Sequence, residues 1–293
     1  MKHKSGFVNI IGNPNVGKST LMNTLIGQKL SITTNKVQTT RHRIKGILNG
    51  DDYQIVFSDT PGFIKPSYKL QESMMYYVYS AFKDADILVY MVEPEENKNN
   101  NDQIFKIIKE TQVPLLILIN KIDLYDQNIV EKEIKKWSQK YSNSKVIPIS
   151  ALNKFNISKI RKDIIDLLPI SPPYFEKDAI TDKSSRFFVE EIIREKILIH
   201  YKKEIPYSVQ IQVEDFIESV DSIEIRAVIY VMRESQKGII IGHRGLGLKR
   251  IGSEARKDIE KMLGKHIYLH TPVKVKKNWR KDTSQLKKFG YQS

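Results

Sequence analysis

The chain has 293 residues, no cysteine and a formal net charge of +14 at pH 7. The missing cysteines exclude disulfide bonds and cysteine-ligated metal centres, and they favour a reducing cytoplasm. At roughly 100–200 residues per domain, this length predicts two domains. No apolar run approaches the ~20 residues of a membrane-spanning helix, and the run Phe7–Ile11 is too short for a secretory signal. We therefore expect a soluble, cytoplasmic protein.

Strands and helices alternate over residues 1–170. Apolar runs predict strands at Phe7–Ile11, Ile44–Leu48, Gln54–Ser58, Ile87–Val92, Leu115–Ile119 and Lys145–Ile149. Helical patterns lie at Lys18–Ile26, Gln71–Ala85, Asp102–Thr111, Ile129–Tyr141 and Ile157–Leu168. This alternation predicts an α/β domain with a mostly parallel sheet and helices on both faces.

A change of pattern follows at Pro169–Pro173, where three prolines in five residues predict a semi-rigid linker over residues 171–185. Residues 186–293 then predict a small α+β domain that ends in a basic tail. Its expected elements are a helix over 186–204, strands over 207–216 and 222–232, a helix over 246–263 and a strand over 266–276. The sequence therefore predicts a second, smaller domain behind the linker.

A phosphate-binding loop is predicted between the first strand and the first helix. Residues 12–19 read GNPNVGKS, which matches the pattern GxxxxGK[ST] in the strand–loop–helix context that this motif requires. The loop lets backbone N–H groups point at phosphates, and the helix N-terminus adds positive potential. Lys18 is expected to reach the β- and γ-phosphates, and the Ser19 hydroxyl to bind Mg²⁺. The predicted phosphate contacts are Gly12, Asn13, Pro14, Asn15, Val16, Gly17, Lys18, Ser19, Thr20 and Gly62.

Three further segments favour guanine over adenine, which the phosphate loop alone does not distinguish. Asp59 begins the run DTPG, where its carboxylate can hold Mg²⁺ and the Gly62 N–H can reach the γ-phosphate. Asp123 ends the run NKID, and its carboxylate can accept hydrogen bonds from guanine N1–H and the N2 amine. Adenine offers neither donor, so an unpaired carboxylate there costs ~1–3 kcal/mol or more. The third segment, Ser150–Leu152, follows the last expected strand, where the Ala151 N–H can contact guanine O6. The predicted guanine contacts are Asn120, Lys121, Asp123, Ser150 and Ala151.

Any one of these segments is also typical of an ordinary turn after a strand. All four occur in order at the carboxyl ends of expected strands, where open α/β sheets bind ligands. The segments together resemble the translation-factor class of GTPases, which implies two switch segments. The switch residues would be Gln38, Thr39, Thr40 and Arg41, followed by Asp59, Thr60, Pro61, Gly62 and Phe63. By this resemblance Thr40 joins Ser19 and Asp59 as a Mg²⁺ ligand when GTP is bound, although the adjacent Thr39 leaves the register open.

Phe63 stands where many GTPases place a glutamine that orients the attacking water. A phenyl ring cannot make that hydrogen bond, so hydrolysis must rely on other groups. The chain thus resembles GTPases with a hydrophobic residue here, several of which use an asparagine equivalent to Asn15 to bind K⁺. We hypothesise that K⁺ stimulates this enzyme through Asn15, and we expect slow intrinsic hydrolysis suited to a timed switch.

A GXXG loop at Gly242–Gly245 follows an apolar half-turn in the second half. In KH domains such a loop clamps the backbone of about four single-stranded nucleotides. Between Lys237 and Lys288 there are fifteen basic and four acidic residues, a net of +11, which favours a polyanionic partner. The order of elements resembles a type II KH domain. The predicted RNA contacts are Gly242, His243, Arg244, Gly245, Lys249, Arg250, Lys277, Trp279 and Arg280.

The whole chain resembles the bacterial Era family. The residues that carry this resemblance are Gln38–Arg41, Phe63, Arg194–Lys196, Ile239–Gly245 and Phe289–Tyr291. The resemblance implies binding to the 3′ end of small-subunit (16S) ribosomal RNA, a role in assembly of that subunit, and peripheral association with the inner face of the cell membrane. We expect a monomer. His243 departs from the family, whose members often carry lysine there, so part of that charge is lost near neutral pH.

Other interpretations remain open from the residues alone. A tRNA-modifying GTPase would carry further domains and a cysteine motif, and a duplicated ribosome-assembly GTPase would carry a second phosphate loop; the sequence shows none of these, which argues against both. The first domain is also compatible with a nucleotide sensor that does not hydrolyse GTP, although Lys18, Ser19, Thr40 and Asp59 are all present. The GXXG run also occurs in plain helix linkers. The basic stretch is also typical of a solvated face or of a surface that docks on anionic lipid.

Overall fold

The computed structural model describes residues 2–95 and 102–292. The chain divides into two compact units, one made of residues 1–66 and 74–182 and the other of residues 67–73 and 183–293. Among the described residues, no helix is both long enough and apolar enough to cross a membrane. The two units are described separately below and are called the first and the second domain.

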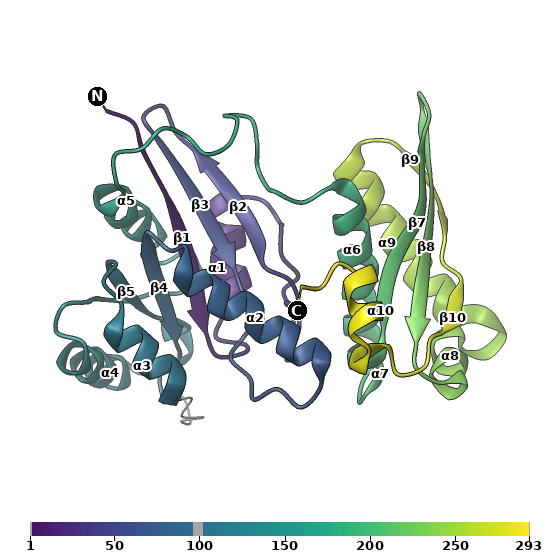
Figure 1. The fold of residues 1–293 in the computed structure, drawn as a ribbon, viewed down its shortest axis with the longest axis horizontal. Coiled ribbons are helices and arrows are strands. Elements are labelled where there is room, and N and C mark those ends of the chain that lie inside the picture. The colour runs from purple at the N-terminus through teal and green to yellow at the C-terminus, as the bar shows by residue number, and fades with distance from the viewer. Residues whose placement is uncertain (1, 96–101, 293) are drawn as a thin grey trace. The chain divides into compact units, whose positions relative to one another are not determined.

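The first domain is built on a six-stranded sheet with the order β2-β3-β1-β4-β5-β6 (Figure 1). Its strands are β1 (Lys4–Gly12), β2 (Ile44–Asn49), β3 (Tyr53–Asp59), β4 (Ile87–Val92), β5 (Leu115–Ile119) and β6 (Lys145–Pro148). Neighbouring strands run parallel except β2, which pairs antiparallel with β3. The predicted mostly parallel α/β sheet is therefore confirmed, and the carboxyl ends of five strands meet at one edge.

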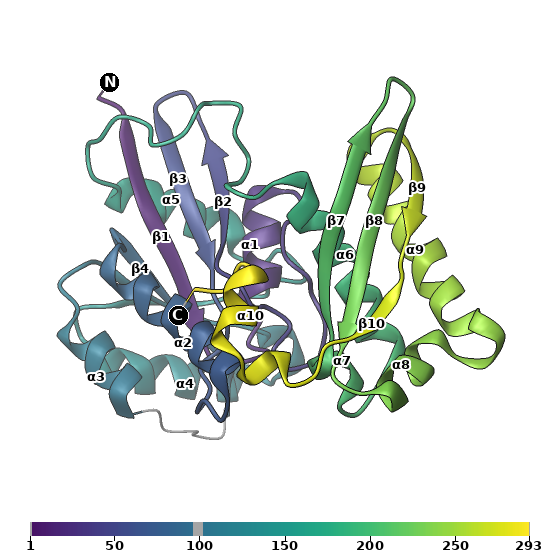
Figure 2. The ribbon, with the colours of Figure 1, turned by 45° about the vertical axis from the view of Figure 1, so that its right-hand side comes forward.

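Helices cover both faces of this sheet (Figure 2). They are α1 (Lys18–Ile26), α2 (Lys69–Lys83), α3 (Asp102–Glu110), α4 (Gln127–Lys140) and α5 (Ile157–Leu167). One buried cluster joins α2, α3 and α4 to alternate residues of β4 and β5, as expected for side chains that point to a single face of a strand. Helices α1 and α5 pack against each other. Between Ile119 and α4, a short 3₁₀ turn (Ile122–Leu124) follows β5.

Most of the predicted linker is a segment that is hydrogen-bonded to the first domain. The Gln54 side chain accepts hydrogen bonds from the backbone N–H groups of Tyr174 (2.7 Å) and Phe175 (3.0 Å), and it donates to the Phe175 carbonyl. Further along, the Ile47 N–H donates to the Ile180 carbonyl at 2.8 Å. Residues 171–182 thus satisfy the outer edge of β2 and fold as part of the first domain, because their backbone groups are paired there.

The second domain is a mixed sheet in which β8 lies between β7 on one side and β9 and β10 on the other. Its elements are α6 (Ser185–His200), α7 (Ile205–Ser208), β7 (Gln210–Glu218), β8 (Ser222–Val231), α8 (Glu234–Ile241), α9 (Leu246–Leu263), β9 (His266–His270) and β10 (Val273–Val275). Strands β7 and β8 are antiparallel, whereas β9 and β10 run parallel to β8. Helices α6 and α9 pack together over a core of aliphatic residues. The predicted α+β domain is confirmed.

The C-terminal stretch folds back onto the second domain. After β10 the chain forms a 3₁₀ turn (Trp279–Lys281) and a short helix α10 (Thr283–Lys288), whose N-cap Asp282 accepts a hydrogen bond from the Gln285 N–H. Trp279, Leu286, Phe289 and Tyr291 are buried. The predicted basic tail therefore carries an apolar anchor, with its lysines on the outside and its aromatic rings in the core.

Candidate nucleotide and RNA sites

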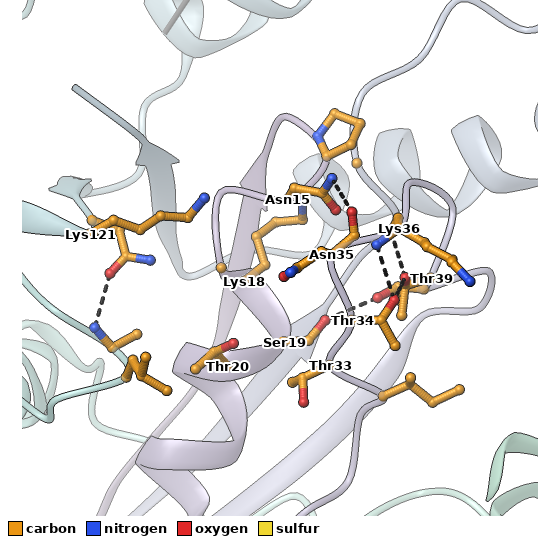
Figure 3. A pocket seen from close by; sticks show the side chains of 18 of the residues that line it. Asn15, Lys18, Ser19, Thr20, Thr33, Thr34, Asn35, Lys36, Thr39 and Lys121 are labelled. Atoms are coloured by element: carbon orange, nitrogen blue, oxygen red, sulfur yellow. Dashed lines mark hydrogen bonds between the residues drawn. The ribbon is translucent and has the colours of Figure 1, made fainter. Parts of the chain in front are cut away.

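A cavity of about 600 Å³ opens at the carboxyl edge of the first sheet (Figure 3). Its wall combines the phosphate loop, the first switch segment and the two predicted guanine segments. The predicted residues that line it are Pro14, Asn15, Gly17, Lys18, Ser19, Thr20, Gln38, Thr39, Thr40, Gly62, Asn120, Lys121, Asp123, Ser150 and Ala151. Its volume falls in the ~300–1,000 Å³ range of small-molecule sites.

The phosphate loop is held by its own lysine. Lys18 is buried, and its ammonium donates to the carbonyls of Gly12 (3.0 Å) and Asn13 (2.8 Å). Gly17 has a φ of +100°, and a Cβ there would lie 2.3 Å from Nδ2 of Asn120. A side chain at this position would therefore strain the backbone and collide with the guanine segment. The loop closes tightly over the start of α1, whose N–H groups face the cavity.

Three oxygen-bearing side chains converge beside this loop. The Ser19 hydroxyl donates to the Asp59 carboxylate at 2.6 Å and lies 3.0 Å from the Thr40 hydroxyl, which in turn lies 3.3 Å from Asp59. Thr39 instead donates to the Lys36 carbonyl. The structure therefore decides the register that the sequence left open. It brings Thr40, and not Thr39, to Ser19 and Asp59.

The same group has the character of a hard-cation site. Asp59 is fully buried, and its Oδ1 has no hydrogen-bond partner among the described residues. Burial raises the pKa of Asp59, while the Ser19 hydroxyl and the Lys18 charge oppose that rise. A buried carboxylate with an unsatisfied oxygen and two neighbouring hydroxyls is the donor chemistry that Mg²⁺ prefers. The residues present thus fit a magnesium ion bound with the triphosphate.

The guanine side of the cavity is organised by Asn120. Its side-chain amide donates to the Val16 carbonyl (2.7 Å) and its oxygen accepts the Ala151 N–H (2.9 Å), which links three loops. The predicted O6 donor, the Ala151 N–H, is therefore engaged with Asn120 in this structure. Asp123 lies exposed on the wall of the cavity, and the Lys121 ammonium pairs with Glu93 at 2.6 Å.

The second switch segment approaches the phosphate loop closely. A Cβ on Gly62 would lie 2.5 Å from the Pro14 nitrogen, so only glycine allows this contact. The Thr60 hydroxyl donates to the Ile10 carbonyl, and Phe63 lies in a buried cluster with its ring 6.4 Å from that of Tyr90. Phe63 therefore serves the core and presents no polar group to the cavity. Buried Arg41 lies at the other switch.

The cavity also contains residues that the motifs did not indicate. Five of them form one run just before the first switch, namely Ile32, Thr33, Thr34, Asn35 and Lys36, and two are exposed leucines, Leu124 and Leu152. Leu124 and Leu152 directly follow the motif residues Asp123 and Ala151, so their places in the sequence could have indicated an apolar wall beside the base. The run 32–36 has no motif, and only the fold brings it to the site.

The GXXG loop of the second domain depends on unusual backbone angles. Gly242, Arg244 and Gly245 all have positive φ values of 72°, 49° and 77°. This path turns the chain sharply between α8 and α9, and it leaves His243 and Arg244 exposed. Lys249 and Arg250 follow on the exposed face of α9, where Arg250 pairs with Glu254. The loop presents a strained, basic turn of the kind that can approach a phosphate backbone.

Two contacts support this loop from behind. The Tyr201 hydroxyl donates to the Ile240 carbonyl at 2.8 Å, in the last turn of α8. The first turn of α9 passes so close that a Cβ on Gly247 would lie 2.8 Å from that carbonyl and from the Tyr201 hydroxyl. The glycine therefore allows the close crossing of α8 and α9 that shapes the turn.

One predicted RNA contact is wrong. Trp279 is fully buried, its indole N–H donates to the Ser208 carbonyl, and its ring packs edge-on against Phe289. A side chain in this position cannot stack on a base, because its faces are covered by the core. Arg280 is half-buried and donates to the Tyr207 carbonyl, whereas Lys277 is exposed. Within this segment, Lys277 and part of Arg280 remain accessible.

Comparisons with known proteins identify both domains. Residues 7–121 match a family model described as a 50S ribosome-binding GTPase, and residues 204–280 match one described as a KH domain. The chain is 44% identical to GTPase Era of Thermoanaerobacter sp. (strain X514) over 99% of this chain and 97% of that protein. It is 43% identical to GTPase Era of Caldanaerobacter subterraneus subsp. tengcongensis over 99% of both chains.

Two solved structures are similar over nearly the full length. One is Era in complex with MgGDPNP and nucleotides 1506–1542 of 16S ribosomal RNA, with a TM-score of 0.95, 36% identity and coverage of 99% of this chain and 100% of that one. The other is a single-residue variant of Aquifex aeolicus Era bound to GDP·AlF₄⁻, with a TM-score of 0.94, 36% identity and the same coverage. Sequence, domain order and structure agree along the entire chain, which therefore belongs to the Era family and is a GTPase with a C-terminal KH domain.

Proposed function

We propose that this GTPase is a Mg²⁺-dependent switch whose KH domain binds the 3′ end of small-subunit ribosomal RNA during assembly of that subunit. The observation that carries the nucleotide half is the convergence of Ser19, Thr40 and Asp59 beside Lys18 in the cavity that also holds Asp123. The RNA half is supported by the exposed basic GXXG turn and by the 16S ribosomal RNA fragment in the similar Era structure.

The first domain can support hydrolysis by positioning and charge. Lys18 would contact the β- and γ-phosphates, and Ser19, Thr40 and Asp59 would hold Mg²⁺ directly or through water. The bound ion would neutralise charge on the phosphate oxygens. The Gly62 N–H would approach the γ-phosphate as water attacks its phosphorus and the bond to the β-phosphate oxygen breaks. Because Phe63 lies in the core, no side chain at that position orients the water. We therefore expect slow turnover.

Base selectivity is the sharpest test of the nucleotide site. Titration calorimetry should find tight binding of GTP and GDP and at least ~100-fold weaker binding of ATP, since adenine leaves the Asp123 carboxylate without a donor. Asp123→Asn should weaken GTP and improve binding of xanthosine triphosphate, whose base has the complementary hydrogen-bond pattern. Equal affinity for GTP and ATP would contradict the assignment of the cavity.

We also propose that K⁺ acts next to the phosphates through Asn15. The Asn15 side chain donates to the Asn35 carbonyl at 3.1 Å, so it lies between the phosphate loop and the run before the first switch (Figure 3). Turnover should be severalfold faster in K⁺ than in Na⁺ at equal ionic strength, and Asn15→Asp or Asn15→Ala should reduce that ratio. Identical rates in the two salts would exclude this role.

The RNA assignment can be tested in cells and in solution. Crosslinking followed by sequencing should recover the 3′ end of small-subunit ribosomal RNA, and a short RNA of that sequence should bind with a salt-dependent affinity. Recovery of unrelated RNA, or of none, would contradict the proposal. We expect the predicted contacts Gly242–Gly245, Lys249, Arg250 and Lys277 to lie at that interface.

An anionic membrane is the competing ligand for the same basic surface. We propose a mainly cytoplasmic monomer with a peripheral fraction on the inner membrane face, held by exposed lysines such as Lys249 and Lys277. Flotation with anionic vesicles should recover part of the protein, and the RNA fragment should compete for it. Membrane binding that RNA does not affect would place the lipid contact elsewhere.

A further inference from the structure

A buried arginine links three strands and the end of a helix, next to the chain segments that carry Thr40 and Asp59. Arg43 directly precedes β2, and its side chain is only 10% exposed. All three guanidinium nitrogens donate hydrogen bonds, to Ser58 on β3, to Asn9 on β1 and to Asp84 just after α2. The contact with Asp84 is bidentate, with distances of 2.7 and 2.9 Å.

The partners of Arg43 are themselves fixed. Ser58 and Asn9 are fully buried and lie opposite each other in the parallel ladder of β1 and β3. The Asn9 amide donates to the Ala81 carbonyl, in the last turn of α2, and to Asp84. A planar guanidinium with five donors suits this arrangement, since a lysine ammonium could satisfy only part of it. Arg43, Ser58, Asn9 and Asp84 therefore form one hydrogen-bonded cluster, the Arg43 cluster, which links the start of β2 through β3 and β1 to the end of α2.

The Arg43 cluster lies next to the two chain segments that carry the predicted magnesium ligands Thr40 and Asp59. Thr40 precedes Arg43 by three residues, and Asp59 directly follows Ser58. The antiparallel ladder pairs Ile44 with Asp59, so Arg43 sits at the point where the two strands first meet. Any shift of the Arg43 side chain would therefore move the Thr40 segment relative to the Asp59 carboxylate.

We propose that Arg43, held by Asp84, is a positioning residue that keeps Thr40 beside Asp59 for metal-assisted nucleotide binding. This inference rests on the proposed Mg²⁺ site. It adds a residue that touches neither nucleotide nor metal, and it links the first switch to the helix that follows the second. A purely structural role would lower stability without changing how strongly Mg²⁺ improves nucleotide affinity.

The test measures the affinity of a fluorescent, non-hydrolysable GTP analogue with Mg²⁺ and with EDTA, below the unfolding transition of each variant. The ratio of the two affinities is the readout. Arg43→Gln should reduce this ratio about tenfold while the affinity in EDTA stays within about twofold of wild type. Asp84→Asn should reduce it about threefold, because the 43%-exposed Asp84 side chain can be replaced in part by water. The affinity ratio of Arg43→Lys should lie between those of the wild type and of Arg43→Gln.

Two further variants separate the possible outcomes. Asp163→Asn is the matched control, because Asp163 pairs with Lys145 at 2.5 Å within the same domain but joins α5 to β6. Thr40→Ala reports on the magnesium site itself. If Thr40→Ala lowers the ratio and the Arg43 and Asp84 variants match Asp163→Asn, the inference is wrong. If Thr40→Ala leaves the ratio unchanged, the proposed Mg²⁺ site itself is contradicted, and the inference about Arg43 falls with it. Should Arg43→Gln not fold, Asp84→Asn decides.

Discussion

The two domains hold most of their predicted functional groups in different environments. In the first domain, Lys18, Asp59 and Asn120 are at most 5% exposed, and each is held by hydrogen bonds to neighbouring segments, although Asp123 is exposed. In the KH domain, His243 and Arg244 are exposed, and the feature that positions them is the shape of the backbone. The predicted nucleotide site is preorganised mainly by burial, and the predicted RNA site by the backbone angles of a turn.

This difference has consequences for mutation. A buried polar group cannot be removed without leaving its partners unsatisfied, which costs ~1–3 kcal/mol each. An exposed side chain on a turn can be replaced with little effect on folding. We therefore expect changes in the first domain to combine loss of function with loss of stability. Replacing the exposed His243 or Arg244 side chain of the GXXG turn should affect RNA binding alone.

The largest expected effect is at Lys18. Lys18→Ala removes the charge predicted to face the β- and γ-phosphates, so GTP turnover should fall about 10²–10³-fold, the range observed when one such donor is removed. The melting temperature should fall as well, because two carbonyls of the phosphate loop lose their donor. Lys132→Ala, on an exposed part of α4, is the control in a multiple-turnover assay. Turnover of Lys18→Ala within tenfold of wild type would contradict the assignment of Lys18 to the phosphates.

The second effect concerns Gly242. Gly242→Asp puts a side chain at a φ of +72° and a negative charge where RNA phosphates are expected, so RNA affinity should fall about 100-fold or more. GTP affinity should be unchanged. Gly264→Asp adds the same charge at a positive φ of 68° at the far end of α9, but its ψ of 13° differs from the 178° of Gly242, so the melting temperature of both variants is measured as well. Equal loss of RNA binding in both variants, measured by fluorescence anisotropy, would argue against a local clamp.

Glu190 sharpens the comparison, because it is a half-buried carboxyl in the domain whose predicted RNA contacts His243 and Arg244 are exposed. Burial raises the pKa of Glu190 to about 7 from 4.5, although its carboxylate accepts the Val213 N–H at 2.8 Å. The folded state thus binds this proton more tightly than the unfolded state. Protonation of Glu190 therefore adds to the free energy of unfolding. This contribution is fully present below pH 4.5 and is lost as pH rises through about 7, a change of about 3 kcal/mol.

Unfolding followed by Trp279 fluorescence in a Trp137→Phe background isolates the KH domain, since the chain has two tryptophans. Glu190→Gln should remove most of this decline between pH 5 and 8.5 while keeping the acceptor for Val213. The variant should therefore be the more stable protein at pH 8.5. A wild-type stability that does not change over this range would show that Glu190 is solvated in both states.

The smallest effect tests how the turn is supported. Gly247→Ala places a methyl group 2.8 Å from the Ile240 carbonyl, so α8 and α9 must separate. We expect a loss of about 1 kcal/mol in stability and a three- to tenfold loss in RNA affinity. Gly252→Ala, on the same helix, has only Thr271 at 3.7 Å and should be neutral or slightly stabilising in thermal denaturation. If the two alanines behave alike, the close crossing does not shape the turn.

Much of the fold could be predicted because its signals are local. The boundaries of α1, β4, β5 and α9 agree with the sequence prediction, since each is a continuous apolar run or begins at a motif glycine. The split of the predicted strand 266–276 into β9 and β10 was missed, although Pro272 stands between them. Helix α10 was also missed, because its short basic sequence has one buried face that only packing reveals.

The candidate sites divide in the same way. Motif spacing predicted that Lys18, Ser19, Asp59 and Asp123 act at one site, because strand ends in an open parallel sheet must meet at one edge. Spacing did not identify Arg43, since its partners Asn9 and Ser58 lie on other strands. It misassigned Trp279 to RNA, because a tryptophan among lysines looks exposed until the core is known.

Sequence alone thus determined the domain order, the nucleotide class and the GXXG turn, all of which depend on residues that are neighbours along the chain. The tertiary structure decided that Thr40 rather than Thr39 joins Asp59, that residues 171–182 belong to the first domain, and that Trp279 is core. These depend on contacts between distant segments. Burial and hydrogen bonding across such contacts are set by the whole fold, so no local pattern encodes them.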